Sequence, residues 1–381
     1  MYLQKISLIN FKNFREADIS FSENINCFVG NNGAGKTNLL DAIHYLSFCK
    51  SSFNPIDSQN IFHGAEFFII QGSYNKDDKI EKIHCGLKRN QKKQFKRNKK
   101  EYKRLADHIG FLPLVMISPE DGSLITGGSE SRRKFIDGII CQLDKIYLDN
   151  LINYNRVVAQ RNSLLKHFAE KRRLDKDALG VWDAQMIELG NKIYEKRLEF
   201  IKVFIPIFQK HYKFISESKE RVNIDYQSQL NAGDFERLLA DNLERDRTIL
   251  YSSVGVHKDD MVFNVSTGSA LKDGSNSDKY MIKKYGSQGQ QKSYLIALKL
   301  AQFDFIKSVK NFPPILLLDD IFDKLDSLRV QKLIKLVSNK NFGQIFITHT
   351  HPEKIYEILN DIDTEYNVYK IEKGMVDKVE I

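Results

Sequence analysis

The spacing of apolar residues divides the chain into strand-like and helix-like stretches. Short alternations and clusters of apolar residues predict strands at residues 3–9, 17–21, 26–29, 67–74 and 79–88. Residues 39–48 instead carry leucine and isoleucine at three- or four-residue spacing, which predicts a helix directly after a glycine-rich loop. The first third of the chain is therefore expected to be mixed α/β.

From residue 131 to residue 214 the strand-like alternation disappears and helical spacing dominates. Residues 175–180 are expected to separate two long antiparallel helices. After Arg221 the pattern is mixed again, and it ends in a strand–helix–strand arrangement from Pro314 onward. We predict an α/β head interrupted by a mostly helical insert: residues 1–120 and 245–381 form the two parts of the head, and residues 121–244 the insert.

Composition limits the class of protein. Hydrophobic residues make up 42% and charged residues 28% of the chain, which is typical of globular domains. No apolar run is long enough to cross a bilayer and no leader pattern is visible, so a cytoplasmic protein without a membrane partner is expected. The four cysteines show no metal-ligand spacing.

The formal net charge is +9, and the excess is concentrated in residues 88–104. A lysine-rich hairpin of this kind is either a solvated surface or a surface that follows a phosphate backbone. We favour the second interpretation. The candidate DNA-binding residues are Lys88, Arg89, Lys92, Lys93, Lys96, Arg97, Lys99 and Lys100.

A phosphate-binding loop follows the third predicted strand. Residues 30–37, Gly-Asn-Asn-Gly-Ala-Gly-Lys-Thr, match the pattern G-x-x-x-x-G-K-[ST] at every position. Backbone N–H groups of such a loop converge on phosphate oxygens at the positive end of the next helix. Lys36 is expected to reach the β- and γ-phosphates of ATP, and Thr37 to bind Mg²⁺. The candidate ATP-binding residues are Gly30, Asn31, Asn32, Gly33, Ala34, Gly35, Lys36, Thr37 and Asn38.

A second element supplies acidic residues. Residues 314–318 form a continuous apolar run that ends in Asp319 and Asp320, as expected of a buried parallel strand with ligand groups at its carboxyl end. Asp319 is expected to hold Mg²⁺, and Asp320 to orient or deprotonate the attacking water. The side chain of aspartate is one methylene shorter than that of glutamate and reaches less far toward the water, so slow hydrolysis is expected.

Three further segments resemble ABC ATPase motifs. Ser287, Gln288, Gly289 and Gln290 precede a predicted helix about thirty residues before the acidic strand and resemble the signature motif. That resemblance implies a contact across a dimer to the γ-phosphate held by the partner. Asp323 and Asp326 lie in a segment that resembles the D-loop, and His349 ends a predicted strand like the histidine that senses the γ-phosphate, with His351 as the competing candidate.

The whole chain resembles the RecF family, which has an ABC-type head similar to that of SMC proteins. The segments that carry the resemblance are residues 117–121 (Ile-Ser-Pro-Glu-Asp), 132–137 (Arg-Arg-Lys-Phe-Ile-Asp), 255–260 (Gly-Val-His-Lys-Asp-Asp) and 287–301. Val256 and Lys258 replace the family's proline and arginine, Lys292 also stands where arginine is usual, and Asn54 replaces an expected arginine.

The resemblance implies a repair ATPase that forms an ATP-dependent homodimer and binds gapped DNA or junctions between single- and double-stranded DNA. It also implies partnership with RecR and RecO in loading RecA. Other classes remain open at this point: another SMC-like ATPase, a transporter ATPase subunit, or a scaffold that binds ATP without hydrolysing it. The first would need long coiled-coil arms, for which the insert is too short, or an added nuclease domain.

Overall fold

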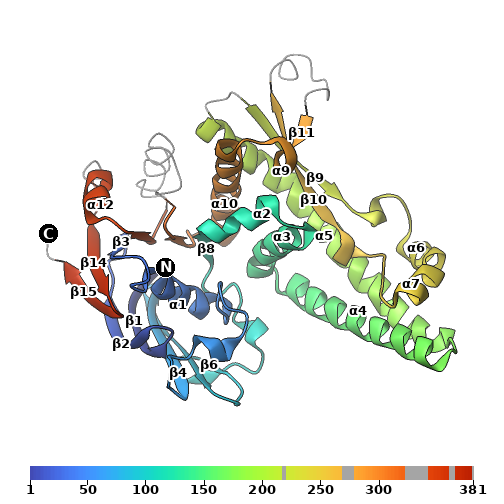
Figure 1. Cartoon of the computed structure of the whole chain (residues 1–381), viewed down its shortest axis with the longest axis horizontal. Coiled ribbons are helices and arrows are strands. Elements are labelled where there is room, and N and C mark those ends of the chain that lie inside the picture. The colour runs from blue at the N-terminus through green and yellow to red at the C-terminus, as the bar shows by residue number, and fades with distance from the viewer. Residues whose placement is uncertain (217–219, 268–278, 322–341, 360–364, 380–381) are drawn as a thin grey trace. The chain divides into compact units, whose positions relative to one another are not determined.

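The computed structural model describes residues 1–216, 220–267, 279–321, 342–359 and 365–379. The chain divides into two compact units, one made of residues 1–121 and 298–381 and the other of residues 122–297 (Figure 1). No helix in the described ranges is long and apolar enough to cross a membrane. The predicted mixture of sheets and helices is confirmed.

The first unit contains a mixed sheet with the strand order β15-β14-β3-β13-β12-β8. All neighbours pair in parallel except β14 and β15. Strands β3, β12 and β13 are buried at every position, which explains why apolar residues dominate their sequences. The exceptions are Asn26 in β3 and Thr348 and His349 in β13. The bounds are β3 (Ile25–Val29), β8 (Leu114–Ile117), β12 (Ile315–Leu318), β13 (Ile345–His349), β14 (Tyr366–Glu372) and β15 (Met375–Val379).

An antiparallel sheet with the order β2-β1-β4-β5-β6-β7 forms the rest of this unit. Helix α1 contacts strands of both sheets, and one core joins all three through residues such as Leu40, Phe68 and Leu317. The elements are β1 (Tyr2–Phe11), β2 (Phe14–Ser20), α1 (Lys36–Phe48), β4 (Phe67–Lys76), β5 (Lys79–Lys88), β6 (Gln94–Arg97), β7 (Lys100–Glu101) and α12 (Pro352–Leu359). Short 3₁₀ helices lie at Asp57–Asn60, Leu105–Asp107 and Pro119–Asp121.

The second unit is mostly helical and carries an antiparallel sheet of order β11-β10-β9. Its helices are α2 (Gly122–Thr126), α3 (Ser129–Leu143), α4 (Lys145–Lys171), α5 (Lys176–Ser216), α6 (Phe235–Asp241), α7 (Leu243–Ile249), α9 (Ile282–Tyr285) and α10 (Gln288–Lys310). Its strands are β9 (Glu220–Gln227), β10 (Asp260–Thr267) and β11 (Lys279–Met281), and 3₁₀ helices lie at Gln229–Asn231 and Val256–Lys258. The boundary between the units falls within α10.

The long helices α4 and α5 pack against each other (Figure 1). Their connection is earlier than the predicted residues 175–180, because α4 ends at Lys171 and α5 begins at Lys176. The side chain of Asp175 accepts a hydrogen bond from the N–H of Ala178, which is the bond of an N-cap residue. Gly180 therefore lies inside α5 and does not end a helix.

Residues 245–297 group with the second unit, whereas the sequence placed them in the C-terminal part of the head. The physical reason is strand pairing. Strand β10 pairs along its whole length with β9 and also contacts α3, so its interactions are with the helical part of the chain. A return to mixed structure along the sequence does not by itself show which core a strand joins.

Candidate nucleotide-binding site

The glycine-rich loop connects β3 to α1 and is closely packed at two of its glycines. Gly30 has φ +155°, and a Cβ there would lie 2.3 Å from the carbonyl oxygen of Ile371 in β14. Gly35 has φ +120°, and its Cβ would lie 2.4 Å from Nδ2 of Asn13. Both positions require a residue without a side chain, so the loop's backbone path depends on these two glycines.

Lys36 is the first residue of α1 and is buried, with 5% of its surface exposed. Its Nζ donates hydrogen bonds to the carbonyl oxygens of Gly30 (2.6 Å) and Asn31 (3.1 Å). The ammonium group therefore lies over the loop, next to the positive end of α1. Asn31, Asn32 and Gly33 are exposed, which leaves one side of the loop open to solvent.

Thr37 connects the loop to the acidic strand. Its Oγ1 donates to both carboxylate oxygens of Asp319, at 2.9 and 3.0 Å. Oγ1 of Thr348 in β13 donates to Oδ1 of Asp319 at 2.8 Å. Burial raises the pKa of Asp319, and the hydrogen bonds from Thr348 and Thr37 act in the opposite direction. Residues far apart in sequence thus form one oxygen-rich centre.

Asp320 follows with unusual backbone and side-chain environments. Its φ is +49°, a left-handed conformation that is uncommon for a residue other than glycine. Its N–H donates to Oγ1 of Thr348 at 2.9 Å. Its Oδ1 is buried and accepts no hydrogen bond from any residue in the described ranges. A buried oxygen without a hydrogen-bond partner costs free energy, and each such atom in a folded protein calls for an explanation. This carboxylate is therefore a candidate for contact with a ligand or a water.

His349 ends β13 and is 1% exposed. Its Nδ1 accepts a hydrogen bond of 2.8 Å from the backbone N–H of His351, and this places the proton of the neutral imidazole on Nε2. His351 itself is exposed. Of the two candidates from the sequence, His349 is therefore the one fixed at the carboxyl edge of the parallel strands.

Two contributors were missed by the sequence analysis. The side chain of Asn13 donates to the carbonyl oxygen of Ala34 at 2.9 Å and accepts from Nδ2 of Asn38 at 2.8 Å. Asn13 thus holds the loop from the turn after β1. Thr348 is the second residue missed, because a threonine within an apolar strand is typical of β-structure. No local pattern distinguishes either residue from an ordinary turn or strand position.

The residues present suit a nucleoside triphosphate with a divalent cation. The loop provides a glycine cradle, a buried ammonium group and a helix N-terminus for phosphate oxygens. The hydroxyl of Thr37 and the carboxylate of Asp319 are hard oxygen ligands of the kind that Mg²⁺ prefers. The predicted loop and acidic residues are therefore brought together in the first unit, although their roles remain a prediction.

The signature-like residues belong to the second unit, at the start of α10. Oγ of Ser287 accepts from the N–H of Gln290 at 3.2 Å, and the N–H of Ser287 donates to Oε1 of Gln290 at 2.7 Å. This reciprocal arrangement is a capping box. Ser287 and Gln288 are exposed, and Gly289 is partly buried. Asp323 and Asp326 lie outside the described residues.

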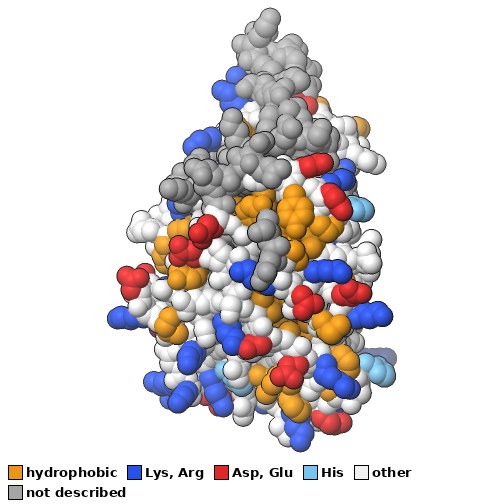
Figure 2. Space-filling model, turned by 90° about the vertical axis from the view of Figure 1, so that its left-hand side faces the viewer, with side chains coloured by type: hydrophobic (Ala, Val, Ile, Leu, Met, Phe, Trp, Pro, Cys, Tyr) orange, Lys and Arg blue, Asp and Glu red, His pale blue; other side chains and the backbone are white. Residues whose placement is uncertain are grey.

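The basic hairpin lies at the β5–β6–β7 end of the antiparallel sheet. Two of its cations are paired with carboxylates of the same unit: Nζ of Lys93 pairs with Asp57 at 2.7 Å, and Arg97 pairs with Glu81 at 2.7 Å. Lys88, Arg89, Lys92, Lys99 and Lys100 are exposed, and Lys96 is partly buried. On the face seen in Figure 2, basic and acidic side chains are interspersed. DNA binding by the hairpin therefore remains a prediction that rests mainly on its exposed cations.

Comparison with known proteins identifies the family. Residues 2–377 match the model of the RecF/RecN/SMC N-terminal domain. The chain is 52% identical over 378 residues to the DNA replication and repair protein RecF of Phocaeicola vulgatus, covering 99% of this chain and 98% of that protein. It is 50% identical over 371 residues to RecF of Flavobacterium johnsoniae, covering 97% and 100% respectively.

Solved structures agree with this match. The structure of the recombination mediator protein RecF-ATP in the RecFOR pathway is 30% identical, with a TM-score of 0.87, and the match covers 100% of this chain and 98% of that one. An Smc head domain from Pyrococcus furiosus is 17% identical, with a TM-score of 0.59 over 100% and 96% of the chains, and shows the shared fold alone. The chain belongs to the RecF family and has its ABC-type ATPase head.

Proposed function

We propose that this RecF-family chain binds and slowly hydrolyses ATP with Mg²⁺, and that the bound nucleotide controls its association with DNA in recombinational repair. The observation that carries the proposal is the pair of hydrogen bonds from Thr37 to Asp319, at 2.9 and 3.0 Å. They join the end of the phosphate loop to the end of the acidic strand, where a nucleotide-bound cation needs oxygen ligands.

Each residue of the site then has a role. Lys36 neutralises charge on the β- and γ-phosphates, and Thr37 and Asp319 hold Mg²⁺. The cation, when bound, withdraws charge from the phosphate oxygens as a Lewis acid. Asp320 orients the attacking water through its buried carboxylate and accepts its proton. His349 donates Nε2–H toward the γ-phosphate. The short side chain of Asp320 favours slow turnover, which suits a switch.

Control of DNA binding by the nucleotide follows if the phosphate loop of one copy meets Ser287 of another, because these two groups belong to different units of the chain. ATP held by the loop of one copy would be contacted by Ser287 of a second copy, and the reverse contact would form at the second nucleotide. A nucleotide that binds the dimer better than the monomer shifts the equilibrium toward the dimer. Support comes from the exposure of Ser287 and Gln288 at the start of α10, because groups that act on a second molecule must be accessible.

The partner chemistry is drawn from the family. We infer that the dimer binds gapped DNA or junctions between single- and double-stranded DNA in the cytoplasm, and that it acts with RecR and RecO in loading RecA. The RecF relatives are DNA replication and repair proteins, and the solved RecF belongs to the RecFOR pathway. The exposed cations of residues 88–100 are the first candidate DNA surface.

The proposal is tested by fluorescence anisotropy of a labelled gapped duplex titrated with protein, first with ATP and Mg²⁺ and then with ADP. Wild type is expected to bind more tightly with ATP. The Ser287→Arg variant is expected to lose that gain, because the arginine side chain blocks approach of the partner's nucleotide. Monomeric ATP binding should remain, since Ser287 and the loop belong to different units.

The matched control is Gln185→Arg, another exposed polar residue of the second unit, which should behave like wild type. If DNA binding ignores the nucleotide in every protein, gating is wrong even if ATP is bound. If ATP binds and gates DNA but no phosphate is released, the chain is a scaffold that uses ATP only as a ligand.

A further inference from the structure

Two of the segments that resemble the RecF family lie together in the second unit and take no part in the nucleotide site. They are residues 132–137 in α3 and residues 255–260, which lead into β10. The guanidinium of Arg132 makes a two-pronged contact with Asp260, at 2.7 and 2.9 Å. The neighbouring Arg133 donates to the carbonyl oxygen of Asp259. The two segments are thereby fixed against each other.

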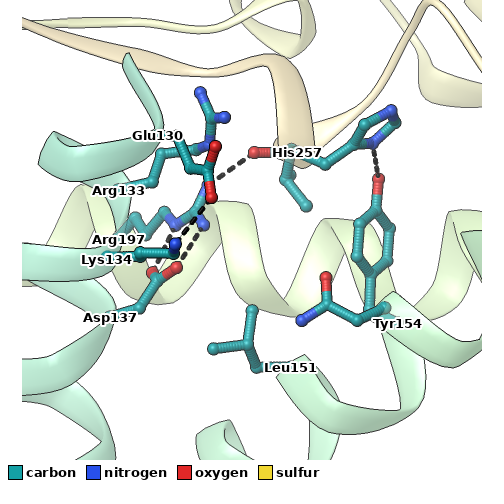
Figure 3. A pocket seen from close by; sticks show the side chains of 10 residues that line it. Glu130, Arg133, Lys134, Asp137, Leu151, Tyr154, Arg197 and His257 are labelled. Atoms are coloured by element: carbon teal, nitrogen blue, oxygen red, sulfur yellow. Dashed lines mark hydrogen bonds and ion pairs between the residues drawn. The ribbon is translucent and has the colours of Figure 1, made fainter. Parts of the chain in front are cut away.

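A cavity of about 270 Å³ opens beside this junction and is lined by Glu130, Arg133, Lys134, Asp137, Leu151, Tyr154, Asn155, Arg197, Val256 and His257 (Figure 3). Most charged groups of its inner wall pair with one another. Arg197 pairs with Asp137 at 2.9 Å and with Asp259 at 2.8 Å. Oδ1 of Asp259 is the exception, because it is buried and accepts no hydrogen bond from the described residues.

Both ring nitrogens of His257, which lines the cavity, already have hydrogen-bond partners. One ring nitrogen of His257 pairs with the hydroxyl of Tyr154 at 2.9 Å, and the other with the carbonyl oxygen of Ser252 at 3.1 Å. Burial lowers the pKa of His257 to about 4, so the ring is neutral near pH 7. The wall is therefore a structural network, and any ligand chemistry must come from groups nearer the surface.

Two cations at the surface differ from this network. Arg133 and Lys258 form no ion pair with any carboxylate in the described ranges, whereas Lys134 pairs with Glu130 at 2.6 Å. Nζ of Lys258 lies 4.7 Å from the ring centre of Tyr251. Arg133 is held by its hydrogen bond to the backbone of residue 259. Both cations are thus positioned by contacts that do not neutralise them.

The two positive charges also act on each other. Burial, followed by repulsion from Arg197, lowers the pKa of Arg133, and attraction by Asp259, Asp137 and Asp260 acts in the opposite direction. Burial, followed by repulsion from Arg133, lowers the pKa of Lys258, and Arg245 adds to that repulsion. An anion placed next to both cations would relieve this repulsion.

The carboxylates near Arg133 and Lys258 already form ion pairs with other arginines. Asp137 and Asp259 pair with Arg197, Asp260 with Arg132, and Asp246 with Arg161. Each of these carboxylates is therefore paired with a guanidinium, and Asp137 and Asp259 share that of Arg197. The uncompensated charge at this surface is positive, and it comes from Arg133, Lys258 and Arg245.

We propose that Arg133 and Lys258 form a second DNA-contacting site of the chain, one that binds phosphodiester groups beside this cavity. A nucleic acid is favoured over an acidic protein segment because Tyr251, the ring that positions Lys258, is 47% exposed. An accessible aromatic ring beside cations suits a base next to its phosphate. The net charge of +9 also favours a polyanion. The inference rests on the proposed DNA binding and adds a surface to it.

The test measures binding of a labelled gapped duplex to full-length protein with ATP, over a range of salt concentrations. The variant Arg133→Gln/Lys258→Gln removes both cations. Its binding is expected to be weaker by about tenfold at low salt, and the slope of log K against log salt should fall in magnitude by about 2. ATP binding and ATP-dependent dimerisation should not change.

The matched control is Lys192→Gln/Arg247→Gln, which removes the same charge from cations of this unit that pair with Glu188 and Glu244. The single variant Lys258→Glu is included because Lys258 is exposed and its replacement leaves the Arg133 hydrogen bond intact. It should weaken DNA binding on its own. Equal DNA binding by the double variant and the control would overturn the proposal.

Two other results are informative. If the double variant binds DNA like wild type but loses affinity for a poly-aspartate peptide, the surface recognises an acidic protein segment and the DNA assignment is wrong. If wild type itself binds no gapped duplex with or without ATP, the proposed function fails, and this inference fails with it.

Discussion

The phosphate loop and the start of α10 are both polar turns that lead into a helix, but they are held in different ways. In the loop, Gly35 and Lys36 are buried, and Asn13 binds the loop from a neighbouring strand turn. At the start of α10, Ser287 is exposed and its hydroxyl caps its own helix. The first site is enclosed by its own unit, while the second faces solvent.

The unit supports the turn at the start of α10 indirectly, through contacts to Gln290 and not to Ser287. Nε2 of Gln290 donates to Oε1 of Glu220 at 2.6 Å and to the hydroxyl of Tyr280 at 3.1 Å. The hydroxyl of Tyr212 donates to the other oxygen of Glu220. These contacts fix the amide of Gln290, whose oxygen accepts from the N–H of Ser287. The turn is thus oriented by its unit but leaves its own groups accessible, which is what contact with a second molecule requires.

The largest expected effect is on the rate of ATP hydrolysis, with little change in ATP binding. Asp320→Asn removes the carboxylate that is proposed to accept a proton from water. Asparagine tolerates the left-handed φ of this position, so the backbone should be kept. Phosphate release at saturating ATP and Mg²⁺ is expected to fall by about 10²–10⁴-fold. ATP binding, measured with a fluorescent analogue, should change little.

The same experiment tests gating. If hydrolysis ends the ATP-bound state, the Asp320→Asn dimer should persist longer after ATP is added, as measured by size-exclusion chromatography. The control is Asp304→Asn, an acid of α10 that ends no strand of the parallel sheet. A variant that releases phosphate at the wild-type rate would show that Asp320 is not the proton acceptor.

A smaller effect is expected where the exposed turn meets its support. Glu220→Ala removes both hydrogen bonds that the carboxylate accepts, so Nε2 of Gln290 keeps only the longer contact to Tyr280 and is held less firmly toward Ser287. A hydrogen bond to a charged group contributes enough free energy that ATP-dependent dimerisation should weaken by about tenfold. Dimerisation is measured by analytical ultracentrifugation with ATP.

ATP binding to the monomer serves as the internal reference for Glu220→Ala and should not change, since the loop belongs to the other unit. Tyr280→Phe removes the longer contact to Gln290 and should give a weaker form of the same defect. Unchanged dimerisation in both variants would mean that the orientation of Gln290 does not matter for assembly.

The sequence alone indicated most of the residues that the structure brings together around the phosphate loop. The glycine loop, Lys36, Thr37 and the two acids are local patterns. They follow β3 and β12, which are short, mostly apolar strands that are buried at every position. Their meeting could be expected because parallel strands place their carboxyl ends at one edge of a sheet. This expectation corresponds to the Thr37–Asp319 hydrogen bonds.

The supporting residues could not be predicted because they act across long separations in sequence. Asn13 contacts a residue 21 positions away, and Glu220 contacts one 70 positions away. The pairing of β10 with β9 and the ion pairs of Lys93 and Arg97 also depend on tertiary structure. Spacing shows which residues can face the same way but not which distant side chain they meet.

The smallest expected effect is on ATP affinity, and it comes from weakening the support of the phosphate loop. Asn13→Ala removes two neutral hydrogen bonds, to Ala34 and from Asn38. Each is worth less than a bond to a charged group, so ATP affinity of the monomer should fall by about twofold to tenfold. Dimerisation should decline only as far as nucleotide occupancy does, and it should recover at higher ATP concentrations. Glu220→Ala should not recover in this way, because its defect lies after nucleotide binding. If saturating ATP restores both variants equally, the two turns are not supported independently, and the contrast between an enclosed and a presented site is wrong.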